Sequence, residues 1–427
     1  MMSAPPNDSP PTGSTRLGEE EAIAAVELPP APARQTSRAL LVVSLMLLAF
    51  DLRPAFSSLG PVLPELVKDT GLSTFGASVL STAPVLCLGL FGPIAPWIGR
   101  RLGTERAIMV FLIVLTIGTA LRGVPGGAAL FGGSILAGIG IGIINVLVPG
   151  LIKRNFPNRM ALMMGVHTMM LCAGGALGAG AAVPLESYFD GSWAASLAFW
   201  GIPALAGVLL WLPHVPRRDS AGGGPGFRVH GLWRDPLAWR VTLFMAFQSA
   251  VFYAGLAWYP PILRARGLDP NEAGLVVSIS ILVQLGSSFI APPLAMLGRD
   301  QRAAVMISEL LLAIGAMGLL FGPLWTIWGW AVVIGLGQGA LFALALTMIV
   351  LRSRDQHVAA QLSSMVQSVG YTVASGAALI AGLFYGTAGG REAIGALFLV
   401  LLAAGSICGW SAGKNAFVGA TVVPRKA

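Results

Sequence analysis

Two charged residues, Asp51 and Arg53, lie in the middle of the first strongly apolar segment of the chain. They belong to the stretch LLAFDLRPAFSSLGP within residues 39–64, which otherwise has the composition of a membrane-spanning helix. A charge at that depth costs roughly 2.5–3.5 kcal/mol on insertion scales, so it is expected to face the protein interior or an aqueous cavity. Arg53 could then bind an anionic or strongly dipolar substrate, and Asp51 could be its counter-ion or carry a coupled proton. An internal salt bridge, or an arginine that reaches outward, would explain the same residues without a substrate.

Pro54 follows Arg53 directly and predicts a kink in this helix. Proline has no backbone N–H to donate, and it disfavours helical geometry in the residue before it. The kink would expose backbone carbonyls to a cavity. Because residues at i and i+2 do not share a face of a regular helix, Asp51 and Arg53 are expected to have different partners.

Further polar side chains occur inside other apolar segments. His167 could carry a proton or donate a hydrogen bond to a substrate, although a structural histidine is an equal alternative. Gln248 and Tyr253 lie in an aromatic segment that would suit a small planar substrate. Hydrogen bonding between helices is the plain alternative for the remaining polar residues, which are Asn145, Gln284, Gln338, Gln367 and Tyr371. Glu309 is expected near the membrane interface.

The composition explains why these residues are unusual. The chain has 427 residues, is 55% hydrophobic and only 11% charged, and has a mean hydropathy of +0.76. Soluble domains are roughly 25% charged, so this composition indicates an integral membrane protein. Apolar segments of about 20 residues, the length of a transmembrane helix, recur about twelve times between residues 39 and 413. Alternation typical of strands is absent from these segments, and we expect an all-α membrane protein.

The segments divide into two halves. We expect bundles of six helices at 39–213 and 239–413, a cytoplasmic linker at 214–238, a disordered tail at 1–38 and a second tail at 414–427. The halves resemble each other at an offset of about 197 residues, where GIGIG at Gly138 matches GLGQG at Gly335. Two parallel six-helix repeats are typical of a transporter in which one half rocks against the other.

The basic residues predict the orientation. If the N-terminus is placed in the cytoplasm, 21 of the 27 lysines and arginines fall on that side. Because this bias sets membrane topology, both termini are expected to be cytoplasmic, with the protein in the inner membrane. The net charge of +8 therefore needs no nucleic-acid partner.

Several other chemistries find no support in the sequence. Cys87, Cys172 and Cys408 lie in three separate segments without metal-ligand spacing, so no metal site or disulfide is expected. The glycine runs lack the Gly-Lys-Ser/Thr of a phosphate-binding loop and are interpreted as helix-packing positions. We expect no cofactor and no enzyme activity, and a gradient of an ion or of the substrate must drive transport.

Residues 92–101, GPIAPWIGRR, resemble the inner loop between the second and third helices of the major facilitator superfamily. The matching positions are Gly92, Gly99, Arg100 and Arg101, to which the resemblance assigns a gating role. Pro96 stands where that loop usually has an aspartate.

Within this superfamily the chain is most similar to the cyanate and 2-nitroimidazole transporter family. The similarity rests on five segments, which are LRPAFSSLGPVLP, AGIGIGIINVLVPGLIKRNFP, FQSAVFYAGLAWYPPIL, GLGQGALFALALTMIVLRS and MVQSVGYTVA. Two positions depart from the family pattern: Asp51 stands where Asn is usual, and His167 stands where Tyr is common. Both departures would add titratable groups to the cavity.

We therefore predict a monomeric, proton-coupled secondary transporter of a small polar or anionic organic molecule that works by alternating access. Its predicted substrate-binding residues are Arg53, Asn145, Gln248, Tyr253, Gln338, Gln367 and Tyr371, and its predicted proton-coupling residues are Asp51 and His167. An efflux pump for aromatic or drug-like compounds is the alternative within the same class. A membrane sensor without net flux is disfavoured, because the linker carries no added domain.

Overall fold

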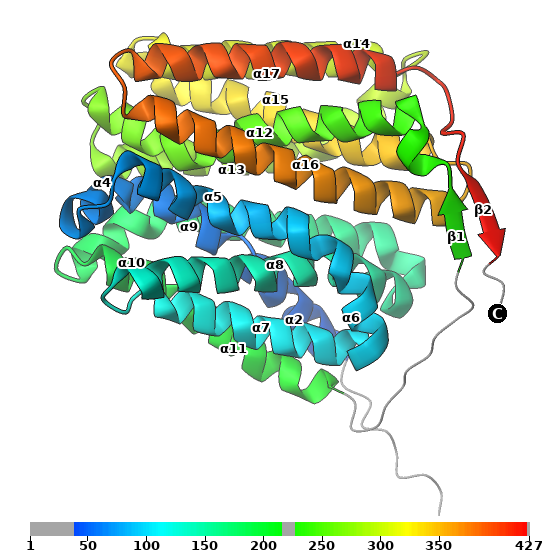
Figure 1. Ribbon diagram of the computed structural model, residues 1–427, viewed down its shortest axis with the longest axis horizontal. Helices are drawn as coiled ribbons and strands as arrows, with labels where there is room; N and C mark the ends of the chain where they lie inside the picture. Colours follow the sequence, from blue (N-terminus) through cyan, green and yellow to red (C-terminus); the bar gives the residue numbers. More distant parts are fainter. Residues whose placement is uncertain (1–37, 216–226, 425–427) are drawn as a thin grey trace, which may run out of the picture. The chain divides into compact units, whose positions relative to one another are not determined.

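The computed structural model describes residues 38–215 and 227–424, and helices dominate this part of the chain. Twelve stretches of these residues are helical, long and apolar enough to cross a membrane. Figure 1 shows the N-terminal helices, from blue to green, in one bundle and the C-terminal helices, from green to red, in a second. The prediction of twelve spans in two six-helix bundles is confirmed.

The N-terminal bundle contains six spans, several of which are broken into shorter helices. Its helices are α2 (Arg38–Asp51), α3 (Pro54–Ser57), α4 (Leu59–Thr70), α5 (Thr74–Phe91), the 3₁₀ turn η1 (Gly92–Ile94), α6 (Ala95–Leu102), α7 (Thr104–Leu121), α8 (Gly127–Asn155), α9 (Met160–Tyr188), α10 (Trp193–Phe199) and α11 (Gly201–Trp211).

The C-terminal bundle is built from longer, mostly continuous helices. They are α12 (Pro236–Ala265), α13 (Pro270–Met296), α14 (Arg302–Phe321), α15 (Ile327–Leu351), α16 (Gln356–Tyr385) and α17 (Gly390–Ala412). The two bundles meet where α5 packs against α16, α9 against α13 and α4 against α12.

The kink predicted at Pro54 is present as a break between α2 and α3. Only long hydrogen bonds of 3.4 Å cross it, from the N–H of Leu52 to the carbonyl of Ala49 and from the N–H of Arg53 to that of Phe50. Pro54 begins α3, a position where its missing N–H leaves no helical bond unmade. The break therefore leaves Arg53 in a turn between two helix ends.

Gly174 of α9 allows this broken helix to pack closely. A β-carbon at Gly174 would lie 2.1 Å from the carbonyl oxygen of Phe50, a backbone atom that cannot rotate away. We expect Gly174→Ala to lower the free energy of unfolding by about 1–3 kcal/mol, the usual cost of overpacking. Thermal unfolding in detergent measures this, with Gly132→Ala as the matched control because Gly132 has open space around its Cα. Equal melting temperatures for the two variants would contradict the prediction.

A short antiparallel sheet joins the linker to the C-terminal tail. Strand β1 (Phe227–His230) pairs with β2 (Thr421–Pro424) in a register that sets Phe227 opposite Pro424. Asp235 lies beside this sheet: it caps α12 by accepting from the N–H of Leu237 at 2.7 Å, and it also accepts from the N–H of Gly419 at 2.7 Å. The predicted linker and tail thus contain paired structure, whereas the tail predicted at residues 1–38 lies outside the described residues except for Arg38.

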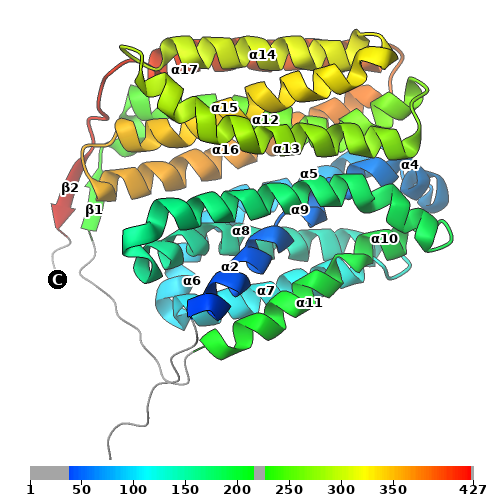
Figure 2. The ribbon, with the colours of Figure 1, turned by 180° about the vertical axis from the view of Figure 1, so that it is seen from behind.

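The sheet marks one end of the bundles, which we call the linker end. α8 finishes there and α9 and α16 begin there, whereas α4 finishes at the opposite end. Figure 2 shows the same arrangement from behind, with α2 lying beside α7, α9 and α11.

Candidate functional site

A cavity of about 490 Å³ lies between the two bundles. Seven polar residues predicted to bind substrate line it, and His167 lines it with them. These seven are Arg53, Asn145, Gln248, Tyr253, Gln338, Gln367 and Tyr371. Residues from both bundles contribute, so a rocking motion of one bundle against the other would change the cavity.

The cavity reaches toward the linker end. Its lining includes Pro96 beside η1, Pro149 near the end of α8, Met164 near the start of α9 and Ala360 near the start of α16. In α12 the lining stops at Leu256, well short of the end of that helix. Access to the cavity is therefore from the linker end.

Arg53 brings the positive charge of the cavity. Its side chain is half-buried, and its guanidinium lies over the ring of Phe252 at 5.6 Å from the ring centre. Among the described residues, no carboxylate pairs with this guanidinium and no oxygen accepts a hydrogen bond from it. A planar cation with five N–H donors is thus left available to an anion.

Aromatic rings form a wall beside Arg53. The ring of Tyr253 lies 5.9 Å from that of Phe56 and 5.9 Å from that of Tyr371, and it meets Phe252 at 5.1 Å. Tilted and edge-on contacts at these distances are favourable and hold the rings in fixed orientations. Of these rings, Phe252, Tyr253 and Tyr371 line the cavity and offer apolar contact to a planar molecule.

The two glutamines of α12 and α15 form a fixed amide pair. Gln338 donates to the side-chain oxygen of Gln248 at 2.6 Å, and Gln248 donates to the hydroxyl of Ser249 at 2.8 Å. Both glutamines are almost fully buried. Because the amide groups of both glutamines already form hydrogen bonds within the protein, these residues mainly determine the shape of the cavity. Gln367 similarly donates to Ser363 at 2.9 Å.

The two predicted proton-coupling residues lie in different places. His167 lines the cavity, and its Nδ1 atom is buried without a hydrogen-bond partner in the described structure. Asp51 is not among the lining residues, because its carboxyl group faces Gly207 of α11 and Leu112 of α7. The break after α2 turns Arg53 toward the cavity and leaves Asp51 inside the N-terminal bundle.

The predicted gating residues divide between the cavity and the surface. Gly92 lines the cavity, and Gly99 packs against Leu147 of α8. Arg100 and Arg101 are exposed, and the guanidinium of Arg101 lies 4.3 Å from the ring centre of Trp97. A gating role for these residues stays a prediction.

The sequence interpretation passed over several lining residues. Cys172 lines the cavity near Arg53, although the sequence indicated no binding role for it. Ser363, Ser364 and Ser368 of α16 also line the cavity. Their spacing with Gln367 and Tyr371 places them on one helical face, and that polar stripe is the signal that could have identified them.

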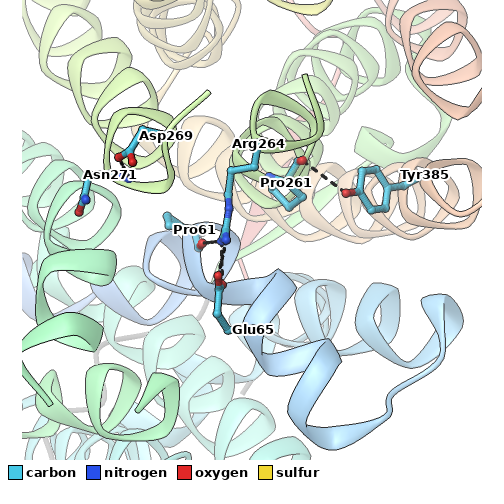
Figure 3. A network of polar contacts seen from close by, with 7 residues as sticks. All are labelled: Pro61, Glu65, Pro261, Arg264, Asp269, Asn271 and Tyr385. Carbon is cyan, nitrogen blue, oxygen red and sulfur yellow. Dashed lines mark hydrogen bonds and ion pairs between the residues drawn. The ribbon is translucent and has the colours of Figure 1, made fainter. Parts of the chain in front are cut away.

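A polar network joins α4 and α12 at the end opposite the linker, as Figure 3 shows. Arg264 forms a two-pronged ion pair with Glu65, in which Nη1 donates to Oε2 at 2.7 Å, and it donates to the carbonyl of Pro61 at 2.9 Å. Tyr385 of α16 donates to the carbonyl of Pro261 at 3.4 Å nearby. Arg264 of the C-terminal bundle thus binds two residues of α4 in the N-terminal bundle.

No metal centre is indicated in residues 38–215 and 227–424. No three His, Cys, Asp or Glu side chains come together there in a group that could hold a metal ion. The chemistry of the cavity is therefore that of a binding site with one cation, one imidazole, amides and aromatic rings.

Comparisons with known proteins identify membrane transporters as relatives of this chain. Residues 45–296 match the family model described as Major Facilitator Superfamily. The chain is 37% identical over 380 residues to the Uncharacterized transporter YycB of Bacillus subtilis (strain 168), covering 88% of this chain and 94% of that protein. It is 36% identical over 341 residues to the 2-nitroimidazole transporter of Escherichia coli (strain K12), covering 79% and 86%. It is 27% identical over 350 residues to the cyanate transport protein CynX of the same strain, covering 82% and 91%.

Solved structures share the fold. A bacterial homolog to the human lysosomal transporter Spinster, in an inward-facing and unoccupied conformation, matches with a TM-score of 0.69 at 17% identity, over 90% of this chain and 98% of that one. A D-xylose-proton symporter matches with a TM-score of 0.69 at 14% identity, over 88% and 97%. The chain therefore belongs to the major facilitator superfamily, as a multi-pass membrane transporter and not an enzyme, and is related to the proteins named for 2-nitroimidazole and cyanate transport.

Proposed function

We propose that this transporter is a monomer that moves a small anionic or strongly polar organic molecule across the inner membrane by alternating access. The unpaired guanidinium of Arg53 in the cavity carries this proposal. A positive charge that is partly removed from bulk water and has no protein partner is stabilised most strongly by an anionic ligand. The volume of about 490 Å³ leaves room for a small molecule together with water.

The orientation is part of the same proposal. The excess of lysine and arginine near the linker end supports a cytoplasmic position for that end. The cavity then faces the cytoplasm, and the pair of Glu65 and Arg264 closes the outer side. Transport would require this pair to separate while the linker end closes.

We assign proton coupling to His167. The imidazole lies close enough to Arg53 for the two charges to interact. An anion bound at Arg53 offsets the positive charge there, so a proton binds more readily at His167 when the substrate is present. Substrate and proton would then cross together.

Replacing His167 with glutamine should separate flux from coupling. Glutamine keeps a hydrogen-bonding side chain but cannot titrate, so downhill uptake persists while accumulation driven by an imposed pH gradient is lost. Uptake into proteoliposomes with and without the gradient measures both. Asp51→Asn is the contrasting variant, and it should keep accumulation because Asp51 does not line the cavity. Gradient-driven accumulation by His167→Gln would contradict the assignment.

The proposed function itself is tested by a transport screen. Proteoliposomes are given a panel of small anions, cyanate among them, and of neutral nitroaromatics, each with an imposed pH gradient. We expect a small anion to accumulate. If no member of the panel crosses the membrane faster than in empty liposomes, the proposed substrate class is wrong.

Export of neutral aromatic compounds is the second candidate function. The aromatic wall of Phe56, Phe252, Tyr253 and Tyr371 favours it, as does the similarity to a protein named for 2-nitroimidazole. Charge dependence distinguishes the two candidates, because transport of a neutral compound should tolerate loss of the Arg53 charge.

A further inference from the structure

Two carboxyl groups lie deep inside the bundles and away from the cavity. Asp51 of α2 is 5% exposed and Glu309 of α14 is 3% exposed. All four of their carboxyl oxygens are buried without a hydrogen-bond partner in the described residues. Glu309 was expected near the membrane interface, and in the structure its carboxyl group points into the bundle.

The two groups occupy matching places in the two halves. The carboxyl of Asp51 faces Gly207 of α11, where a β-carbon would lie 2.8 Å from Oδ2, and Leu112 of α7 lies at the same spot. Glu309 of α14 faces Gly405 of α17, where a β-carbon would lie 2.8 Å from Oε1, and Phe247 of α12 lies beside it.

Gly207 and Gly405 are equivalent positions in the repeat that relates the two halves. Gly207 lies in the sixth span of the first half and Gly405 in the sixth span of the second, at nearly the offset found for the GIGIG and GLGQG motifs. At that offset Glu309 corresponds to Leu112, and Phe247 corresponds to Phe50, the neighbour of Asp51. Each half thus has one carboxyl group where its first, third and sixth spans meet. In the N-terminal half this group is Asp51 of the first span, and in the C-terminal half it is Glu309 of the third span.

The surroundings of both groups are apolar. No charged side chain of the described residues forms an ion pair with either carboxyl group. The titratable neighbour of Glu309 is the Cys408 thiol of α17, and Arg240 of α12 lies near that thiol without pairing with Glu309. An ionised carboxylate in such a place, with neither a cation nor a donor, is far less stable than the neutral acid.

We propose that Asp51 and Glu309 are two matched proton-holding sites, one in each bundle, that stay neutral carboxylic acids during transport and react with apolar carbodiimides. In that reaction the acid O–H adds across one C=N bond of the carbodiimide. The proton goes to nitrogen and the carboxyl oxygen bonds to the central carbon, which gives an O-acylisourea. The acyl group then shifts to nitrogen, and the N-acylurea keeps every atom of both reactants.

Labelling of the full chain in liposomes tests this proposal. The protein is treated at neutral pH with dicyclohexylcarbodiimide, and in parallel with a water-soluble carbodiimide plus an amine, and modified peptides are quantified by mass spectrometry. Glu105 is the matched control, because it is partly exposed and paired with Arg154. We expect the apolar reagent to label both Asp51 and Glu309 about tenfold more than Glu105, and the water-soluble reagent to reverse that order. Failure of the apolar reagent to prefer either site, or preference for one alone, overturns the proposal.

Infrared spectroscopy supplies a second measurement that does not depend on access of a reagent. The spectrum of the wild type at neutral pH should contain the C=O band of protonated carboxyl groups, and Asp51→Asn and Glu309→Gln should each remove part of it. The pH profile of transport should be unchanged in Glu309→Gln, since a group that never loses its proton cannot couple. Loss of carboxylate bands instead of C=O bands, or a shifted pH profile, would show that these groups ionise.

Discussion

Replacing Arg53 with alanine should reduce uptake of a small anion by about 100-fold, because removal of one partner of a desolvated charge pair costs ~2–5 kcal/mol and each ~1.4 kcal/mol is tenfold. Arg53 is the cavity cation without a carboxylate partner in the described structure, so no neighbouring residue compensates for its loss. Initial rates of uptake into proteoliposomes over a range of substrate concentrations measure the effect.

Two controls make this result specific to the charge. Arg53→Lys keeps a cation but loses the planar set of donors, and it should retain an intermediate rate. A neutral nitroaromatic, if it is transported at all, should lose little in the alanine variant because its contacts are with the aromatic wall. Normal anion uptake by correctly folded Arg53→Ala would move the binding site away from Arg53 altogether.

Reversing the charge of Glu65 should open the end of the protein opposite the linker end. In Glu65→Arg two guanidinium groups would face each other between α4 and α12, where the wild type has a two-pronged ion pair. Loss of a partly exposed pair of this kind shifts a conformational equilibrium by about 1 kcal/mol, roughly fivefold in population. The rate of uptake should fall as well, because the variant returns less often to the conformation in which the end opposite the linker is closed.

The natural thiol of Cys172 in the cavity reports this shift. In a variant that keeps Cys172 and replaces Cys87 and Cys408 with serine, a membrane-impermeant thiol reagent should reach the cavity mainly from the linker side. Adding Glu65→Arg should make Cys172 reactive from the other side, and the exchanged pair Glu65→Arg with Arg264→Glu should restore the original pattern. Glu392→Arg is the matched control, since its pair with Arg391 is exposed and joins neighbours in one helix. Unchanged labelling in Glu65→Arg would mean that other contacts close this end.

The same pair should be insensitive to pH near neutrality. Burial by itself would raise the pKa of Glu65, but the hydrogen bonds and positive charge of Arg264 outweigh it, so the pKa lies below its usual value. The stabilisation is therefore complete above the ordinary pKa of a glutamic acid and is lost only as the pH falls through the lowered value.

The sequence predicted the fold well because membrane spans have a strong local signal. The length and hydropathy of each span and the helix break at Pro54 are determined by residues close together in the sequence, and all three predictions agree with the structure. Side-chain direction was harder to predict. Asp51 and Arg53 lie two residues apart, and the turn between them determines which one reaches the cavity.

Contacts between distant segments could not be predicted in this way. Nothing in the residues around Glu65 indicates that Arg264 lies beside it, because that pairing depends on how the two bundles dock. Glu309 was placed at the interface for a related reason: its burial comes from α12 and α17, which cover it from other parts of the chain. Local patterns identify elements, whereas these sites arise only from packing between elements.

The small sheet of β1 and β2 has a consequence for how the protein is made. During synthesis β1 leaves the ribosome before any of the six C-terminal spans exists, whereas β2 (Thr421–Pro424) follows all six of them. The strand must therefore wait for nearly half of the protein to be translated and inserted before its partner is available. The two strands therefore pair only after the C-terminal bundle has been synthesised, and a chain that stops before β2 cannot form the sheet.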